Sequence, residues 1–234
     1  MTGTQTALVV AAGMLAALLG VGGAVVGVVV ALRARRDGGR GVDRGQAAAA
    51  GWTWHGDGRP ALDAAGVHGI GAPGARGVMT ARVGGRDVVV AATTGRGWQV
   101  RRGRVTVSSS ISGPAYTLCA VRLPGPLPTV NLLAEGRGGG VASALGMPDV
   151  DTESGAFNRG RRVVADDDRT AHALLAPHVL EAVASGPDDA TLQTVGDLLV
   201  SYRRGAPDLV EVTARTAWLV RVAQAIPAFL YDPR

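Results

Sequence analysis

Residues 78–93 decide the fold class, and their sequence is VMTARVGGRDVVVAAT. Two apolar-rich segments, 78–83 and 86–93, flank the pair Gly84-Gly85. A two-glycine step between such segments is a strong β-hairpin signal, because the tight turn needs positive φ angles that glycine adopts without strain. The run Val88-Val89-Val90 predicts that the second strand is buried on both faces.

Further strand signals follow toward the C-terminus. Residues 104–111 alternate between apolar and polar side chains, and residues 116–123 form another apolar segment. We expect Pro124 to end the strand at 116–123, because proline has no backbone N–H to donate to a neighbouring strand. The LPGPLP segment that begins at residue 123 favours a rigid turn. Shorter strands are predicted at 129–134 and 161–165. Together the segments indicate an antiparallel meander.

Helix signals come late in the chain. Asp167 or Asp168 can cap a helix that runs through Leu175. Pro177 suits the first turn of a continuing helix that reaches about Ser185.

The segment 191–202 fits two patterns. Gly196-Asp197 between apolar runs favours a hairpin, whereas the apolar residues also recur at helical spacing; we favour the hairpin. A final helix is expected from Pro207 to Pro227. Its inner face consists of Leu209, Val212, Thr216, Leu219, Ala223 and Ile226.

Residues 7–32 contain no charged or strongly polar side chain. As a helix they would span roughly 39 Å, more than the ~30 Å hydrocarbon core of a bilayer. A cleaved signal peptide fits less well, because no basic residue precedes the run and the run exceeds the usual ~7–15 residues.

Taken together, the signals predict the fold class α+β, with an N-terminal transmembrane helix followed by an antiparallel β-meander domain with late inserted helices and a C-terminal helix. The predicted parts are a tail (1–6), the transmembrane helix (7–32), a basic linker (33–50) and the domain (51–234).

Arginines set the expected orientation. Arg33, Arg35 and Arg36 follow the apolar run directly, and positive residues stay on the cytoplasmic side. The N-terminus is thus expected outside the plasma membrane and the domain in the cytoplasm. The same arginines are expected to rest on anionic inner-leaflet lipids.

Small residues recur at helical spacing in the apolar run. Gly20 lies in one such column, and Gly23 and Gly27 form a GxxxG motif in another. Such columns let two helix backbones approach closely, which favours a homodimer or a partner helix. The alternative is compositional, because a run this rich in glycine and alanine contains such columns by chance.

The remaining composition limits the function. The formal net charge is +5, and five arginines and two aspartates in residues 33–44 account for +3 of it. The positive charge is thus partly a membrane flank, and no nucleic-acid partner is predicted. Cys119 is the only cysteine, and we expect it to be buried in a strand. For Trp52 and Trp54, packing on the domain is favoured over a place at the bilayer surface.

A group of acidic residues raises the question of catalysis. Asp149, Asp151 and Glu153 alternate, and three aspartates follow at 166–168. Their spacing lacks the glycine and final glutamate of a calcium loop, and the histidines lack zinc-ligand spacing. We therefore expect no metal, cofactor or catalytic residue, and a non-catalytic domain that binds a partner protein or lipid. The alternative is a membrane-tethered hydrolase or other enzyme that uses the acids of residues 149–168.

One set of residues carries a resemblance to a known family. The set comprises Glu153, Ser154, Phe157, Asn158 and Arg159, then Leu174, Leu175 and Pro177. In this order, with a strand and an acidic cap between the two parts, the set resembles a family of bacterial membrane-anchored proteins. The family is frequent in actinobacteria, and its shared domain has no assigned function. The resemblance covers roughly residues 65–185, and implies a shared fold and anchor but no catalytic residues. Residues 86–94 depart from the family, which tends to carry aromatic residues there.

Overall fold

A computed structural model describes residues 41–68, 70, 72, 74–102, 105–134 and 161–231. The chain divides into two compact units, Met1–Arg40 and Gly41–Arg234, and the first lies outside the described residues. None of the helices in the described part is long and apolar enough to cross a membrane. The predicted spanning segment, residues 7–32, lies outside that part.

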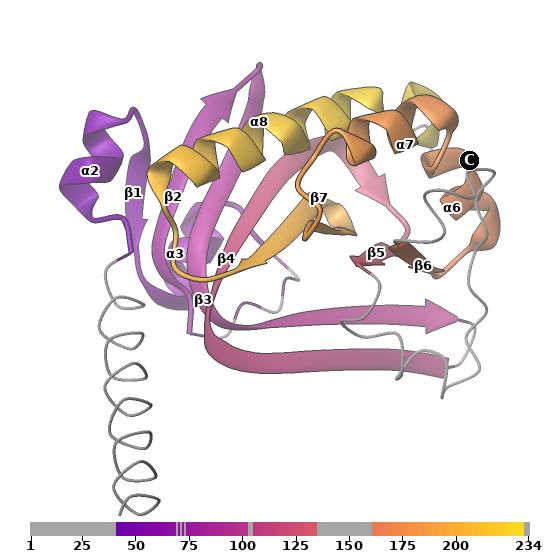
Figure 1. Cartoon of the computed structure of the whole chain (residues 1–234). Helices are drawn as coiled ribbons and strands as arrows, with labels where there is room; N and C mark the ends of the chain where they lie inside the picture. Colours follow the sequence, from indigo (N-terminus) through magenta and orange to yellow (C-terminus); the bar gives the residue numbers. More distant parts are fainter. Residues whose placement is uncertain are drawn as a thin grey trace, which may run out of the picture. The chain divides into compact units, whose positions relative to one another are not determined.

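The second unit is an α+β domain built on one antiparallel sheet (Figure 1). Its strands are β1 (Thr53–Gly56), β2 (Arg76–Val83), β3 (Arg86–Arg102), β4 (Val105–Leu127), β5 (Val130–Ala134), β6 (Arg161–Ala165) and β7 (Thr191–Arg204). Its helices are α2 (Arg44–Ala49), α3 (Gly58–Ala64), α6 (Asp168–Leu174), α7 (Pro177–Ala184), α8 (Leu209–Ala225) and the 3-10 turn η1 (Ala228–Tyr231).

The sheet has the order β1-β2-β3-β4-β7-β5-β6, and every neighbouring pair is antiparallel. Strands β2 to β4 belong to the predicted meander, and the β2–β3 hairpin turns at Gly84-Gly85 as expected. Strand β1, which pairs with β2, was not predicted as part of it. Strand β7, late in the sequence, lies between β4 and β5. The meander prediction is therefore correct for the antiparallel succession β2-β3-β4, and it misses β1 and the insertion of β7 before β5.

The prediction of a hairpin at 191–202 is wrong, because one continuous strand, β7, covers this segment. Both of its edges pair with other strands: Leu199 lies opposite Val121 of β4, and Leu192 lies opposite Leu132 of β5. A strand with partners on both sides satisfies its backbone without folding back on itself. Gly196 takes a φ of +56° where the pairing with β4 becomes irregular, so its glycine marks a distortion within the strand.

Pro124 does not end its strand either. Strand β4 runs from Val105 to Leu127 and joins the two strands predicted at 104–111 and 116–123. The pairing of β4 with β7 breaks between Arg122 and Leu127, so Pro124 lies in an irregular stretch where no ladder hydrogen bond is needed.

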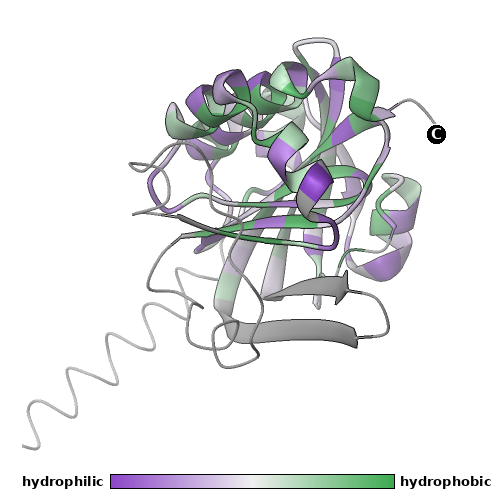
Figure 2. Ribbon diagram, turned by 90° about the vertical axis from the view of Figure 1, so that its right-hand side faces the viewer, coloured by the Kyte–Doolittle hydropathy of each residue, from purple (hydrophilic) through white to green (hydrophobic). Residues whose placement is uncertain are grey.

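Alternating residues of the central strands supply two cores. Val88, Val90, Cys119 and Val121 face the layer that contains α7 and α8. Val89, Ala91, Leu118 and Ala120 face α3 and the residues that follow it. The expected burial of Val88-Val89-Val90 on both faces is thus confirmed. Figure 2 shows the apolar character of these strands and the mixed character of the helices that cover them.

The predicted helices are present, with small shifts in where they begin and end. Asp167 caps α6 by accepting a hydrogen bond from the Thr170 backbone N–H at 2.8 Å, and Pro177 occupies the first turn of a separate helix, α7. Asp208, one residue after Pro207, caps α8. The predicted inner face of α8 packs into the first core. Residues 44–49 of the expected linker form α2, in which Ala47 is fully buried.

Candidate functional site

A buried arginine joins α8 to the sheet. The side chain of Arg215 is only 2% exposed, although it carries a full positive charge. Its Nη1 donates to Ser201 Oγ of β7 at 3.2 Å, and its Nη2 donates to Asp189 Oδ1 at 3.0 Å. The Glu211 carboxylate lies one helical turn earlier, at 3.7 Å from Nη2. The guanidinium therefore crosslinks α8, β7 and the α7–β7 turn.

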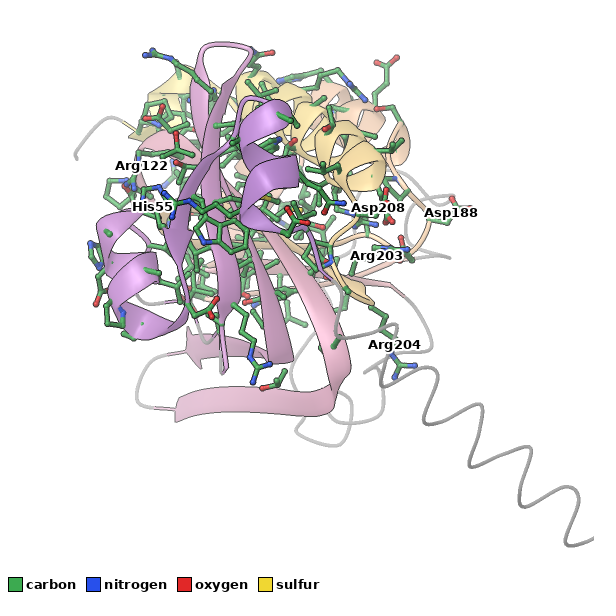
Figure 3. The ribbon with its side chains drawn as sticks, turned by 90° about the vertical axis from the view of Figure 1, so that its left-hand side faces the viewer. His55, Arg122, Asp188, Arg203, Arg204 and Asp208 are labelled. Atoms are coloured by element: carbon green, nitrogen blue, oxygen red, sulfur yellow. The ribbon has the colours of Figure 1, made fainter. Side chains whose placement is uncertain are left out.

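The outer edge of this cluster carries further charges (Figure 3). Arg203, near the end of β7, pairs with the same Glu211 through its Nε. Asp208 accepts hydrogen bonds from the backbone N–H groups of Val210 and Glu211, both at 3.1 Å. These carboxylates stabilise the positive start of α8, and the arginines balance them. We call Asp189, Ser201, Arg203, Glu211 and Arg215 the arginine cluster.

Cys119 lies beneath the cluster on β4. Burial raises the pKa of its thiol from 9.0 to about 12, and the charge of Arg215 offsets only part of this effect. A thiol in this state is neutral at physiological pH and a poor nucleophile. Cys119 is therefore a core residue, as the sequence predicts.

The arginine cluster leaves little space for a ligand. A shallow hollow is lined by Thr117, Cys119, Arg203, Asp208, Glu211, Val212 and Arg215, and it has no room for the centre of a water molecule. Within the described residues, Arg215 Nε is buried without a hydrogen-bond partner. The cluster in this form acts as a structural ion-pair network.

A second arginine fastens the opposite face of the sheet. Arg122 of β4 pairs with Asp197 of β7 through Nη1, and its Nη2 donates to the Gly66 carbonyl at 2.7 Å. Gly66 has a φ of +70°, and a Cβ there would lie 2.5 Å from Arg122 Nη2. The loop after α3 therefore closes tightly over the guanidinium.

An apolar hollow lies between α6, α7, α8 and the strands β5 and β7. Its space for the centre of a water molecule is about 10 Å³, roughly the minimum that one water needs. It is lined mainly by leucine, valine and isoleucine side chains, including Leu174 and Leu175 of the predicted motif. The hollow is a packing defect of the first core rather than a preformed ligand pocket.

The predicted site residues fall in different places. Arg33, Arg35, Arg36, Gly20, Gly23 and Gly27 lie outside the described residues, and so do Glu153, Ser154, Phe157, Asn158 and Arg159. Leu174 and Leu175 are buried in the first core, whereas Pro177 is exposed at the start of α7. Trp52 is buried in the first core and Trp54 packs against it, as favoured from the sequence.

The acidic residues that suggested an enzyme have structural roles where they are described. Hydrogen bonds from the Thr170 hydroxyl and backbone N–H hold the pKa of Asp167 below its usual range. Asp166 Oδ2 accepts a hydrogen bond from the Thr129 N–H at 3.2 Å, which ties the end of β6 to the start of β5. Asp149, Asp151 and Glu153 lie outside the described residues. No group of three metal-binding side chains occurs in the described part of the chain.

Sequence reasoning missed the arginine cluster. A signal for it exists in the final helix, where Arg215 lies three residues after Val212 and one before Thr216, both on the predicted inner face. A charged residue beside a buried helical face needs a partner. Asp189 and Ser201 carry no comparable signal, because only the folded chain brings them to α8.

Known proteins offer limited guidance. The chain matches no family model and no curated protein. A solved structure similar to this chain is the crystal structure of the mycobacterial trehalose monomycolate transport factor A, TtfA. The two are 12% identical, the match covers 86% of this chain and 97% of the other, and the TM-score is 0.47. No function is transferred at this level of likeness.

Proposed function

We propose that the chain is a single-pass plasma-membrane protein whose domain, Gly41–Arg234, is a cytoplasmic module that binds a partner protein or inner-leaflet lipid without catalysis. One observation carries the proposal. The compact domain begins at Gly41, and only residues 33–40 separate it from the end of the apolar run at Leu32. A chain of this length holds the domain within about 30 Å of the bilayer when fully extended.

The paired charges of the domain argue against a nucleic-acid partner. Arg122, Arg203 and Arg215 each pair with a carboxylate of the same domain, so these charges contribute to holding the fold together. Arginines used in this way are poorly placed for nucleic-acid phosphates, which fits a domain that acts on proteins or lipids. We also propose membership of the actinobacterial membrane-anchored family that the sequence resembles.

The orientation can be tested with reporter fusions. A phosphatase that is active only outside the cytoplasm, fused after Arg234, is expected to be inactive, and a fluorescent protein that folds in the cytoplasm is expected to be active. The physical reason is the arginine flank at 33–36, which stays on the cytoplasmic side. The reverse pattern would overturn the proposed topology.

The binding partner can be sought by crosslinking in cells. The full chain would carry a photoreactive amino acid at exposed domain positions, and the adducts would be identified by mass spectrometry. Protein or lipid adducts that depend on the position of the probe support a binding module. Rapid turnover of a small substrate by the purified chain would contradict it.

A further inference from the structure

Building on the proposed membrane anchor, we infer that one edge of the domain, at Gly41 and the start of α8, is a second membrane contact that docks on anionic lipid. We call this edge the tether edge and define it by Gly41, Arg44, Arg204 and Val210; Pro207, which is buried, underlies it at the contact with Gly41. Arg33, Arg35 and Arg36 lie in the linker, whereas the tether edge is part of the folded domain.

On the proposed anchor, the contacts of Gly41 indicate which edge of the domain would face the bilayer. A Cβ on Gly41 would lie 3.6 Å from Pro207 Cδ, so the start of the domain touches the segment between β7 and α8. Val42, the next residue, packs against the first core and fixes this contact. On the proposed topology, the short linker 33–40 attaches to this edge, so the residues around Pro207 are the ones that it would hold near the membrane surface.

Val210 supplies the apolar part of this edge. It follows Pro207 by three residues, lies in the first turn of α8 and is 81% exposed. A single exposed apolar residue is ordinary on a protein surface. At a position held close to a bilayer, the same side chain can enter the headgroup region and lose its contact with water.

Arginines supply the complementary charge. Arg204 is exposed at the end of β7, and Figure 3 shows it pointing away from the body of the domain, unlike Arg203, which pairs with Glu211. Arg44 is exposed at the first position of α2, three residues after Gly41.

Two acids on the same edge are held by helix starts. Asp43 accepts a hydrogen bond from the Gln46 N–H at 2.8 Å, and Asp208 caps α8. The positive ends of these helices offset both carboxylates. With both carboxylates offset in this way, the exposed charges of Arg44 and Arg204 favour anionic lipid.

The test places a reporter on the tether edge of the full chain in lipid nanodiscs. Cys119 is fully buried, so a cysteine introduced by Val210→Cys is the reactive thiol for a fluorescent label. The control is a label at His178→Cys. His178 is exposed on α7, which lies beside the C-terminal end of α8, whereas Val210 lies at its start (Figure 1). Discs contain phosphatidylcholine with or without phosphatidylglycerol, and a lipid with a headgroup spin label quenches fluorescence near the surface.

The inference predicts stronger quenching at position 210 than at 178, and only in discs with phosphatidylglycerol. Arg204→Glu is expected to lower the ratio of docked to undocked domain roughly fivefold or more, because one arginine at a charged surface is replaced by an acid. The matched control is Arg221→Glu, which changes an exposed arginine late in α8 and is expected to leave the ratio unchanged. High salt is also expected to lower the ratio of docked to undocked domain, since it screens exposed charges.

The outcomes separate this inference from the anchor on which it rests. Equal quenching at 210 and 178 in a chain that co-elutes with the discs would overturn the tether edge alone. A chain that does not co-elute with discs would overturn the anchor and the tether edge together. The proposed anionic-lipid contact would also be rejected if quenching at position 210 were the same with and without phosphatidylglycerol and did not change on Arg204→Glu.

Discussion

At the scale of single residues, Arg215 is the most constrained charge of the described domain. Its guanidinium is shielded from water, and a buried charge is tolerated only with well-placed partners. Its carboxylate partners are different, because the side chains of Asp189 and Glu211 remain 38% and 32% exposed. Loss of the arginine leaves acids that water can reach, whereas loss of an acid leaves a cation that water cannot reach.

This asymmetry gives a prediction for Asp189→Ala. The variant is expected to lower the free energy of unfolding by about 1–3 kcal/mol, because the buried guanidinium loses its 3.0 Å carboxylate. Asp188→Ala is the matched control, since both residues lie between Pro187 and Ala190 in one turn and Asp188 is exposed. We expect the control to stay within about 0.5 kcal/mol of the parent in urea unfolding of the full chain in detergent. Equal losses in both variants would contradict the role of Arg215.

The Cys119 thiol gives a prediction about pH. Its pKa in the folded domain is about 12, against 9.0 without burial, so the folded state holds its proton more tightly. Its contribution to stability is therefore complete below pH 9.0 and is lost as the pH rises toward about 12. Between about pH 8 and about pH 10.5 the loss from this group is roughly 2 kcal/mol.

The measurement compares the parent with Cys119→Ala in urea at both pH values. Cys119→Ala leaves a small cavity and is less stable throughout, but it lacks the titrating thiol and should lose less stability as the pH rises. Other groups titrate alike in both chains and cancel. The same pH dependence in both chains would show that the thiol keeps its ordinary pKa.

At the scale of elements, the sequence predicts those structures that local chemistry specifies. The β2–β3 hairpin follows from Gly84-Gly85, and the start of α6 follows from Asp167, because a turn or a cap depends on neighbouring residues only. Strand β7 was not predicted correctly. The pair Gly196-Asp197, taken alone, resembles a turn. The strand stays extended because it pairs with β4 and β5, whose residues lie 60 or more positions away in the sequence.

Packing between α7 and α8 gives a prediction at this scale. Gly186, directly after the α7 C-cap, lies against the indole of Trp218, and a Cβ there would overlap the ring. The ring is also held by its Nε1–H, which donates to the Ala182 carbonyl at 3.0 Å. Gly186→Ala is therefore expected to destabilise the domain by about 1–3 kcal/mol through overpacking.

Gly125→Ala is the control for this change. A Cβ at Gly125 would meet Tyr231 at 3.7 Å, an ordinary contact distance, so a much smaller effect is expected. Tryptophan fluorescence during urea unfolding reports both variants. A Gly186→Ala chain as stable as the parent would show that α7 can move away from Trp218 at little cost.

At the scale of the whole molecule, strand order is the property that the sequence could not supply. The chain leaves the sheet after β6, forms α6 and α7, and returns with β7 between β4 and β5. Each strand signal is local, whereas the order depends on which apolar faces cover one another once all helices are present. For the candidate site, the same reason hides the approach of Asp189 and Ser201 to Arg215.

The anchor gives the last prediction, which concerns self-association of the full chain. In the predicted helix 7–32, Gly20, Gly23 and Gly27 lie on one face and let two backbones come close. Replacing all three with leucine is expected to lower self-association in a two-hybrid assay in membranes, because the larger side chains hold the helices apart. Val25→Leu with Val29→Leu is the control, since these positions fall on the opposite face at 100° per residue and place leucine there instead. An unchanged signal in the triple-leucine chain would indicate that the small residues reflect composition, and that any homodimer forms elsewhere.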